Sequence, residues 1–385
     1  MRRIVILEPD LDGHHAFWLA LLIEAHRQAG WGVEVVTSKD DSRLRAQAAL
    51  RGFELSDVRI HAAVGTSDGE LLKHARALAK RVDADRVFVA FLDRFWPALL
   101  EQSRDWSETA KIAGIWFHPH ALDAKWRFAP PVGKRWKVRG ELHRFIRSSA
   151  AARVLASLYF TVDEPVGKLA RSNPALRGVL LPDPYEREPR LDRDAARRLL
   201  GVPAGRTVFL HLGSPERRKG LPDVLAAFER LGAGASPGSP AAPLLLRVGA
   251  NNRLNRSERD RLAGLVSAGR AMAVEKFVPV DELMEYFAAS DWVLIPYRKF
   301  RYSSGILANA IGAGRPVIAT DHGHIGREVA RAGFGFTYRH GSVPDLTRTL
   351  VRALEADAVT LGRAAGEKEA RTADAFVAAV RESLL

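Results

Sequence analysis

The stretch WVLIPYRKFRYSSGILANAIGAGRPVIAT, residues 292–320, contains a strand, a basic loop, a helix and a second strand in succession. The apolar run Trp292–Ile295 ends at Pro296, where the loop begins. Apolar residues then recur at helical spacing, and Ser303 is predicted to cap that helix. Two glycines and a proline end the helix, and Val317–Thr320 is predicted as the next strand.

The start of this helix predicts a site for an anion. The turn Ser303–Gly305 follows a loop that contains three cations, Arg298, Lys299 and Arg301. Free backbone N–H groups, the positive end of a helix dipole and nearby cations together attract a phosphate or carboxylate. An ordinary helix start in an α/β domain is the alternative that this stretch leaves open.

Length and composition limit the class of protein. The chain has 385 residues, 47% hydrophobic and 27% charged, which predicts a globular protein with room for two domains. It has no cysteine, so we exclude disulfides, thiolate chemistry and cysteine-ligated zinc. The first residues, MRRIVILEPD, predict a strand rather than a signal peptide, and no apolar run reaches the roughly 18 residues of a membrane span. We therefore expect a cytoplasmic protein.

The formal net charge of +13 indicates either an anionic partner or an arginine-rich composition without functional meaning. The segment Lys125–Arg147 concentrates cations around a single acid, Glu141, and interleaves them with tryptophan and phenylalanine. This mixture fits a helical excursion whose aromatic side chains pack inward, which we expect, or a peripheral contact with an anionic membrane, such as the inner membrane face. No stacking motif or recognition helix is apparent, so we expect no nucleic-acid partner.

Strands alternate with helices along residues 1–185 and again along 186–358. The alternation predicts two open α/β domains, each a parallel sheet with helices on both faces, joined near Tyr185–Asp192. Residues 359–385 are expected to form C-terminal helices, with a return to the first domain as one alternative. Ligands of such sheets bind beyond the carboxyl ends of the strands, so we expect a site in a cleft between the domains.

Several loops at strand ends carry candidate residues. In the first domain these are Gly13 and His118, and in the second they are Gly213, Arg217, Arg218 and Lys219. Lys219 follows a strand closely enough to reach a phosphate. Three Asp-x-Asp patterns occur, which shows that the pattern is not specific, and the paired histidines near 14 and 118 lack an acidic or thiolate partner in fixed register. We therefore expect no metal.

Three segments of the second domain resemble a known family. FLHLGSPERRKG (209–220), EKFVPVDELMEYFAASDWVLIPY (275–297) and SSGILANAIGAGRPVIATDHGHIGREV (303–329) resemble, in order, the donor-binding half of GT-B glycosyltransferases, closest to the retaining family 4. The resemblance covers roughly residues 205–355. In the first domain only Gly13, His118 and Leu181–Pro184 fit the family.

The resemblance implies two Rossmann-like domains facing a cleft, and transfer of a sugar from a nucleotide-sugar donor with retention. It implies neither a metal nor another cofactor. Lys219 and the backbone amides of Ser304 and Gly305 would bind the diphosphate, and His118 would act beside the transferred sugar. The implied donor-binding set is Gly13, Gly213, Arg217, Arg218, Lys219, Arg301, Tyr302, Ser303, Ser304, Gly305 and Asn309, and the implied catalytic residues are His118 and Lys219.

The second domain departs from the family pattern in two places. The family's pair of glutamates is replaced by Arg301 and Asn309, and an arginine near the start of the Lys219 loop is replaced by Ser214. Asn309 can still bond ribose hydroxyls through its neutral amide. The alternative function is therefore a catalytically impaired GT-B-like protein that binds nucleotides or glycans as a partner subunit. The acceptor, whether lipid, glycan or small molecule, is not determined by the sequence.

Overall fold

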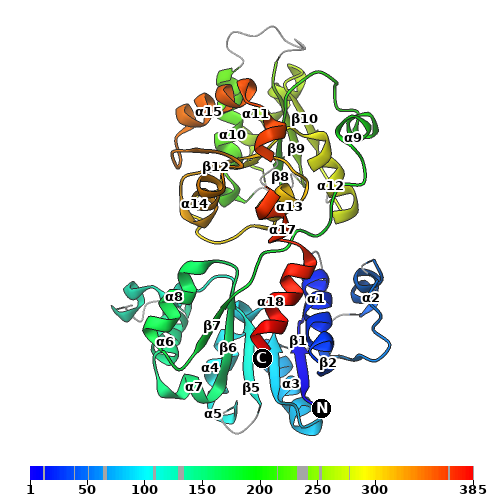
Figure 1. Ribbon diagram of the computed structural model, residues 1–385. Coiled ribbons are helices and arrows are strands. Elements are labelled where there is room, and N and C mark those ends of the chain that lie inside the picture. Colours follow the sequence, from blue (N-terminus) through cyan, green and yellow to red (C-terminus); the bar gives the residue numbers. More distant parts are fainter. Residues whose placement is uncertain are drawn as a thin grey trace. The chain divides into compact units, whose positions relative to one another are not determined.

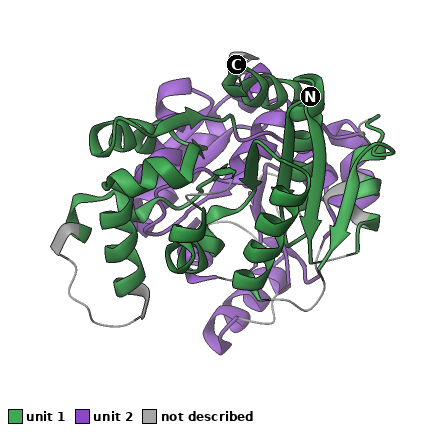
Figure 2. Ribbon diagram, turned by 90° about the horizontal axis from the view of Figure 1, so that it is seen from below, with its two compact units in different colours: residues 1–182, 373–385 green, residues 183–372 purple. Residues whose placement is uncertain are grey.

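The computed structural model describes residues 1–11, 14–38, 40–50, 52–63, 67–106, 110–128, 134–214, 216–231, 242–250, 254–276, 278–362 and 365–384. The chain divides into two compact units (Figures 1 and 2). Unit 1 contains Met1–Pro182 and Ala373–Leu385, and unit 2 contains Asp183–Thr372. The division falls three residues before the boundary expected after Tyr185. The segment that returns to unit 1 begins at Ala373 rather than at residue 359.

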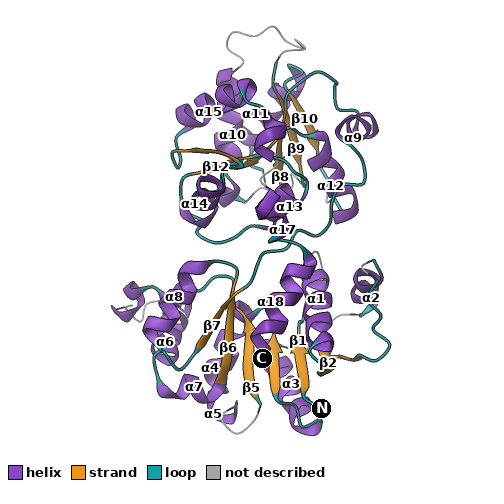
Figure 3. Ribbon diagram, viewed as in Figure 1, coloured by secondary structure: helices purple, strands orange, loops and turns teal. Residues whose placement is uncertain are grey.

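Unit 1 is built on a seven-stranded parallel sheet of order β3-β2-β1-β4-β5-β6-β7 (Figure 3). Its strands are β1 Arg3–Leu7, β2 Gly32–Thr37, β3 Arg59–Ala62, β4 Arg86–Val89, β5 Lys111–Ile115, β6 Leu155–Phe160 and β7 Arg177–Leu180. In β1, Ile4 and Ile6 belong to one apolar cluster and Val5 and Leu7 to another. Both faces of the sheet are therefore buried, as a parallel sheet requires.

Helices cover the two faces of this sheet. They are α1 His14–Gln28, α2 Ser42–Ala49, α3 Asp68–Arg81, α4 Leu92–Glu101, α5 Ser103–Trp106, α6 Lys134–Ile146, α7 Ser149–Val154, α8 Asp163–Ser172 and α18 Ala373–Leu384, with two 3₁₀ turns, η1 His120–Leu122 and η2 Ala124–Phe128. The helix α3 starts at a capping box, in which the Ser67 hydroxyl accepts from the Glu70 amide and Glu70 bonds back to the Ser67 amide.

The last helix, α18, packs in unit 1 against α1. The rings of Trp18 and Phe376 lie 5.1 Å apart between centroids. The hydroxyl groups of Tyr159 and Ser383 lie 2.7 Å apart, and Arg177 Nη1 donates to the carbonyl oxygen of Ser383 at 2.9 Å. The C-terminal helix is therefore part of the unit 1 core.

Unit 2 is built on a six-stranded parallel sheet of order β10-β9-β8-β11-β12-β13. Its strands are β8 Val208–Leu212, β9 Leu244–Val248, β10 Ala271–Val274, β11 Trp292–Ile295, β12 Val317–Thr320 and β13 Gly335–Tyr338. The strand order reverses between β8 and β11, and in open α/β sheets the crevice at such a reversal is where ligands bind.

The helices of unit 2 likewise cover both faces. They are α9 Arg193–Leu200, α10 Leu221–Leu231, α11 Arg256–Ser267, α12 Val280–Ala289, α13 Gly305–Gly312, α14 Gly323–Ala332, α15 Val343–Glu355, α16 Ala358–Gly362 and α17 Ala365–Glu369, with one 3₁₀ turn, η3 Arg217–Lys219. Two apolar clusters lie on opposite faces, one containing Leu210 and the other Phe209. The predicted fold class, two Rossmann-like parallel-sheet units with C-terminal helices, is confirmed.

The basic segment 125–147 forms η2 and α6. Trp126 is buried, but Trp136 is 48% exposed and packs edge-on against Trp126 with ring centroids 4.8 Å apart. The expectation that the aromatic residues pack inward therefore holds for Trp126 and fails for Trp136. Among the described helices, none combines the length and hydropathy that crossing a membrane demands.

Candidate functional site

The loop after β8 is held against the end of β11. It begins at Gly213, whose φ is +112°, and ends at Gly220, whose φ is +69°. A Cβ atom on Gly220 would lie 2.0 Å from the carbonyl oxygen of Pro296, so only glycine fits there. The Arg298 amide also donates to the carbonyl oxygen of Arg218 at 2.7 Å. The loop is therefore fixed at the point where the strand order reverses.

Lys219 lies in the middle of this arrangement. A Cβ atom on Gly213 would lie 2.3 Å from Lys219 Nζ, so the absence of a side chain at residue 213 makes room for the ammonium group. The ammonium nitrogen is 5.8 Å from the centroid of the Tyr297 ring. Among the residues that the structure describes, no carboxylate forms an ion pair with Lys219. The nearby Glu216 is instead bonded to Ser214 and Arg218 at 2.9 and 2.6 Å. Lys219 is thus available to an anion.

Beneath the loop, His211 and Arg247 sit side by side on β8 and β9 and are both buried. Arg247 Nη2 donates to the carbonyl oxygen of Gly213 at 2.7 Å, and His211 Nε2 lies 3.0 Å from the carbonyl oxygen of Lys219. In a trans peptide the C=O and N–H bonds point to opposite sides. Because the carbonyl groups of Gly213 and Lys219 point toward Arg247 and His211, the N–H group of the next residue in each case points away from these two side chains. The amide of Ser214 accordingly points out of the core.

Burial decides the charge of both side chains. It lowers the pKa of His211 to about 3, with the Arg247 charge adding to the shift, so the ring is neutral and Nε2 is the donor. Burial also lowers the pKa of Arg247 to about 10, which leaves it charged at neutral pH. The loop therefore rests on a buried positive charge. Neither residue was predicted from the sequence, although each is the one polar residue of an otherwise apolar strand.

The start of α13 differs from the prediction in one residue. The cap is Ser304, not Ser303, because Ser304 Oγ accepts from the Ile306 amide at 3.3 Å. Ser304 Oγ also bonds Tyr297 Oη at 3.3 Å, while the Ser303 hydroxyl donates to the buried carboxylate of Asp183. A Cβ atom on Gly305 would meet no atom outside its own helix within 4 Å, so the space beside this first residue of the helix is open.

Lys219 and the first turn of α13 therefore meet at one side chain. The ammonium group lies over the Tyr297 ring, and the hydroxyl of the same tyrosine is bonded to the capping Ser304. This brings a cation and the positive end of a helix dipole to the same edge of the sheet, which is the arrangement that binds phosphate groups.

The remaining predicted donor residues of unit 2 lie around this point in different environments. Arg217 is exposed at the surface of the loop, and Arg218 stacks over Phe300 at 5.2 Å while it pairs with Glu216. Tyr302 is buried, and Arg301 is exposed with its carbonyl oxygen accepting from the His324 amide at 3.2 Å.

Asn309 is 5% exposed, and its side-chain oxygen accepts from the amide of Glu186 at 2.9 Å. The structure thus gives Asn309 a role that the sequence did not predict, because it holds the segment that follows Asp183. A contact between Asn309 and ribose remains a prediction.

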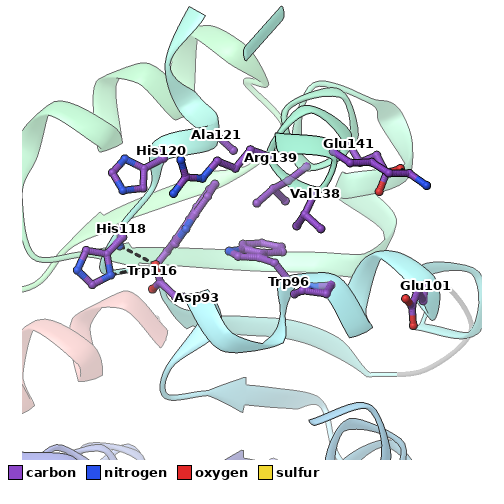
Figure 4. A pocket seen from close by; sticks show the side chains of 13 residues that line it. Asp93, Trp96, Glu101, Trp116, His118, His120, Ala121, Val138, Arg139 and Glu141 are labelled. Carbon is purple, nitrogen blue, oxygen red and sulfur yellow. Dashed lines mark hydrogen bonds and ion pairs between the residues drawn. The ribbon is translucent and has the colours of Figure 1, made fainter. Parts of the chain in front are cut away.

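In unit 1, the predicted His118 follows β5 and lies beside Asp93 of α4 (Figure 4). Asp93 accepts from the amides of Phe117 and His118 at 2.8 and 2.9 Å, and its Oδ1 lies 3.3 Å from His118 Nδ1. The His118 side chain is 43% exposed. The carboxylate therefore orients the partly exposed ring of His118.

Gly13 lies outside the described residues, and so does Asp12 before it. Next to them, the buried Glu8 accepts from the Asp10 amide at 3.0 Å and pairs with His15 Nδ1 at 3.2 Å. Burial lowers the pKa of His15, but the hydrogen bond and charge of Glu8 outweigh it and the net shift is upward. Among the described residues, no three acidic or histidine side chains gather as a metal site would need.

Known proteins resemble the chain in both sequence and fold. Residues 206–356 match the family described as "Glycosyl transferases group 1". A D-inositol 3-phosphate glycosyltransferase of Catenulispora acidiphila is 30% identical over 182 residues, which cover 44% of this chain and 41% of that protein. The chain thus spans about two fifths of the length of this curated relative.

Among solved structures, sucrose-phosphate synthase of Thermosynechococcus elongatus matches with a TM-score of 0.68 at 18% identity, covering all of this chain and 97% of its own. Anabaena Alr3699/HepE in complex with UDP-glucose matches with a TM-score of 0.68 at 14% identity, covering all of this chain and 99% of its own. The chain therefore has the fold of the GT-B glycosyltransferases. Its second unit carries the sequence pattern of the glycosyl transferases group 1, as the resemblance indicated.

Proposed function

We propose that this protein is a glycosyltransferase that moves a sugar from a nucleotide-sugar donor to an acceptor hydroxyl, with retention and without a metal ion. The observation that carries the proposal is the shared contact of Lys219 and Ser304 with Tyr297, where the strand order of unit 2 reverses. A diphosphate fits a site that joins an ammonium group to the first turn of a helix.

The chemistry needs these residues to stabilise the leaving group. The bond between the sugar C1 and the diphosphate oxygen breaks with its electron pair, and a bond from C1 to the acceptor oxygen forms on the same face. The acceptor proton passes to the departing diphosphate, so no enzymic nucleophile is required. Lys219 and the amides at Ser304 and Gly305 hold the charge that develops on the diphosphate, a part that a metal plays in other transferases.

The comparisons support the donor class. The family match covers the unit that contains Lys219 and Ser304, and the Alr3699/HepE structure is described as a complex with UDP-glucose. We assign the acceptor side to unit 1, where Asp93 orients His118. His118 would position an acceptor or donor hydroxyl near the transferred sugar, and Gly13 would allow backbone to approach the diphosphate.

A catalytically impaired, nucleotide-binding partner subunit is the second candidate. Two observations favour it: Arg301 and Asn309 stand where the family pattern has glutamates, and the oxygen of Asn309 is engaged by Glu186. Such a protein would bind nucleoside diphosphates without cleaving the donor.

A binding screen followed by a cleavage assay separates the two candidates. Thermal shift is measured with UDP-, GDP- and ADP-sugars and their diphosphates, because a ligand at about 100 times its Kd adds roughly 2.7 kcal/mol of stability. Each donor that binds is then incubated with the protein, and the released sugar is followed by NMR. The transferase is supported if a donor binds and is cleaved, if the released sugar keeps its anomeric configuration, and if the cleavage rate is unchanged in EDTA. Binding without cleavage or transfer supports the partner subunit, and no binding by any nucleotide rejects both.

We further propose peripheral contact with an anionic membrane surface through the segment 125–147, from the cytoplasmic side. The exposed Trp136, with Lys125 and Arg144 exposed on the same segment, supports this.

A further inference from the structure

Asp183 is the first residue of unit 2, where the chain enters this unit after β7. Its side chain is buried, and the carboxylate accepts a hydrogen bond from the hydroxyl group of Ser303. Burial raises the pKa of Asp183, and the Arg371 charge and the Ser303 hydrogen bond offset only part of this shift. Keeping this carboxyl group buried therefore costs stability, which is more typical of a functional contact than of one that stabilises the fold.

Arg371 is the last residue but one of unit 2, just before the chain returns to unit 1. Its Nη1 donates to the carbonyl oxygen of Asp183 at 3.2 Å, and its own carbonyl oxygen accepts from the Tyr185 amide at 3.1 Å. The buried guanidinium group also forms an ion pair with Glu328 of α14. The segments by which the chain enters and leaves unit 2 are therefore bonded to each other and to α14.

The contacts of Glu328 lead back to the start of α13. Its Oε2 lies 2.9 Å from Nε2 of His324, one turn earlier on α14. The His324 amide donates to the carbonyl oxygen of Arg301 at 3.2 Å, and Arg301 lies two residues before Ser303. The contacts therefore form a closed set around the Ser303 turn, which we call the connection ring. Its members are Ser303, Asp183, Arg371, Glu328, His324 and Arg301.

Helix α13 also rests directly on both connecting segments. A Cβ atom on Gly312 would lie 2.5 Å from Cγ of Tyr185, so the helix lies against the segment that enters the unit. On the same side of the chain, Asn309 accepts from the Glu186 amide. The short helix α17, which precedes Arg371, packs against α13 as well (Figure 1). The helix whose first turn is proposed to hold a diphosphate is therefore the helix on which both connections are anchored.

The two serines of the turn are held by groups of unit 2. Ser303 donates to Asp183, while the hydroxyl group of Ser304 bonds Tyr297 and the Ile306 amide. The direction of the backbone amides that follow Ser303 is thus set by where its side chain is held. A hydrogen bond to a buried carboxylate holds a hydroxyl group more firmly than a bond to water does.

We propose that Asp183 and Arg371 are positioning residues of the phosphate site. Through the connection ring they fix the Ser303–Gly305 turn, and a diphosphate bound at the turn in return stabilises both connecting segments. Neither side chain touches the ligand. The inference rests on the proposed function, because it takes the ligand of the turn to be the diphosphate of the donor. A coupling of this kind is reciprocal, so the ring strengthens binding by the factor by which binding strengthens the ring.

Hydrogen exchange of the ligand-free protein tests the ring without a nucleotide. The reporter is the amide of Tyr185, which donates to Arg371. Ser303→Ala removes the bond to Asp183, and reporter exchange should become about three- to tenfold faster, the range of one hydrogen bond. Ser303→Thr keeps a hydroxyl group and should restore the wild-type rate. Ser342→Ala is the matched control, since it removes the hydroxyl group that caps α15 in the same unit. Equal reporter exchange in Ser303→Ala and the wild type would overturn the proposal.

The second measurement adds UDP, or the nucleotide that gives the largest thermal shift. Bound UDP should slow the Tyr185 reporter in the wild type, and Ser303→Ala should weaken UDP binding by a similar factor, about three- to tenfold. At saturating UDP, the reporter should no longer respond in Ser303→Ala. Asp183→Asn keeps an oxygen acceptor for Ser303 and should retain the response that Asp183→Ala loses. A purely structural role would leave the UDP response intact, so a response of equal size in Ser303→Ala and the wild type would overturn the proposal.

The two proposals fail separately. If no nucleotide binds the wild type, the proposed transferase function is rejected, and with it the coupling to a bound diphosphate. If UDP binds the wild type but does not slow the Tyr185 reporter, only the present inference is rejected.

Discussion

The imidazole Nε2 of His211 lies 3.0 Å from the carbonyl oxygen of Lys219, and the ring is buried with its pKa lowered to about 3. A neutral histidine of β8 therefore holds the backbone of the residue whose ammonium group is predicted to bind the donor. Arg247 holds the other end of the same loop at Gly213. The loop is positioned from beneath, so the Lys219 ammonium group and the outward amide of Ser214 are left for a ligand.

Replacing Lys219 with alanine should weaken binding of a nucleoside diphosphate by about 10- to 150-fold, since it removes one charge-assisted contact of ~1.5–3 kcal/mol. The measurement is calorimetric titration with UDP, or with the nucleotide that gives the largest thermal shift. Arg256→Ala is the control, because the Arg256 side chain is 93% exposed on α11. Equal affinity of the Lys219→Ala and control proteins would show that Lys219 does not touch the diphosphate.

Two glycines with nearly equal φ allow the cost of a left-handed backbone to be measured separately from the cost of a steric clash. Gly220 has a φ of +69° and Gly205 a φ of +74°, but a Cβ atom would clash with the Pro296 carbonyl oxygen only at Gly220. Gly205→Ala should cost about 1–2 kcal/mol of unfolding free energy, from the left-handed conformation alone. Gly220→Ala should cost at least ~1 kcal/mol more, because the loop must also move from β11. Urea denaturation of both variants checks this, and equal losses would mean that the loop is not held against β11.

Acid stability should depend on His211. The folded state keeps His211 neutral down to a pKa of about 3, whereas the unfolded chain takes up a proton below its ordinary pKa of 6.5. The unfolded state thus binds more protons between these values, and the unfolding free energy rises with pH by up to about 1.4 kcal/mol per unit from this residue. His211→Gln keeps a donor for the Lys219 carbonyl but cannot titrate.

The corresponding measurement is the unfolding free energy at pH values from 4 to 7. The His211→Gln protein should lose less stability than the wild type as pH falls below 6.5. Parallel curves for the two proteins would show that His211 is not buried as a neutral ring.

The C-terminal helix should be required for the stability of unit 1. Phe376 of α18 is fully buried against Trp18, so Phe376→Ala should cost about 3–5 kcal/mol. Because the chain has two units, hydrogen exchange is the suitable measurement: protection of α1 amides should fall, while that of α13 is retained. Val359→Ala serves as the control, as Val359 is 53% exposed. Unchanged protection of α1 would contradict the packing of α18 in unit 1.

Membrane contact through segment 125–147 is tested by flotation with anionic vesicles. Replacing Lys125, Trp136 and Arg144 by alanine should weaken association by tenfold or more, since each cation near an anionic surface contributes about 1 kcal/mol and the exposed tryptophan adds interfacial contact. The double control Arg256→Ala and Arg259→Ala removes the same charge from α11, where both side chains are exposed. Equal flotation of the two variants would leave segment 125–147 without a membrane role.

The residues of the candidate site differ in how far sequence alone could identify them. Lys219 and the Ser303–Gly305 turn were predicted because each follows a strand, and loops at the carboxyl ends of parallel strands meet at one edge. The cap itself was placed one residue early, because the Ser303 hydroxyl is taken by Asp183, 120 residues away. The contacts of His211 and Arg247 with the Lys219 loop were not predicted. The residues next to a polar side chain in a strand do not show which distant group that side chain will contact.

The sequence by itself determined the alternation of strands and helices, the two parallel sheets and the start of α13 near Ser303–Gly305. These follow from apolar periodicity, turn glycines and capping residues, which act between close neighbours in the chain. The tertiary structure decided that Tyr297 joins Lys219 to Ser304, that α18 packs on α1, and that Ser303 is bonded to Asp183. These relationships arise from packing between segments far apart in the chain, where local patterns carry no information about which side chains meet.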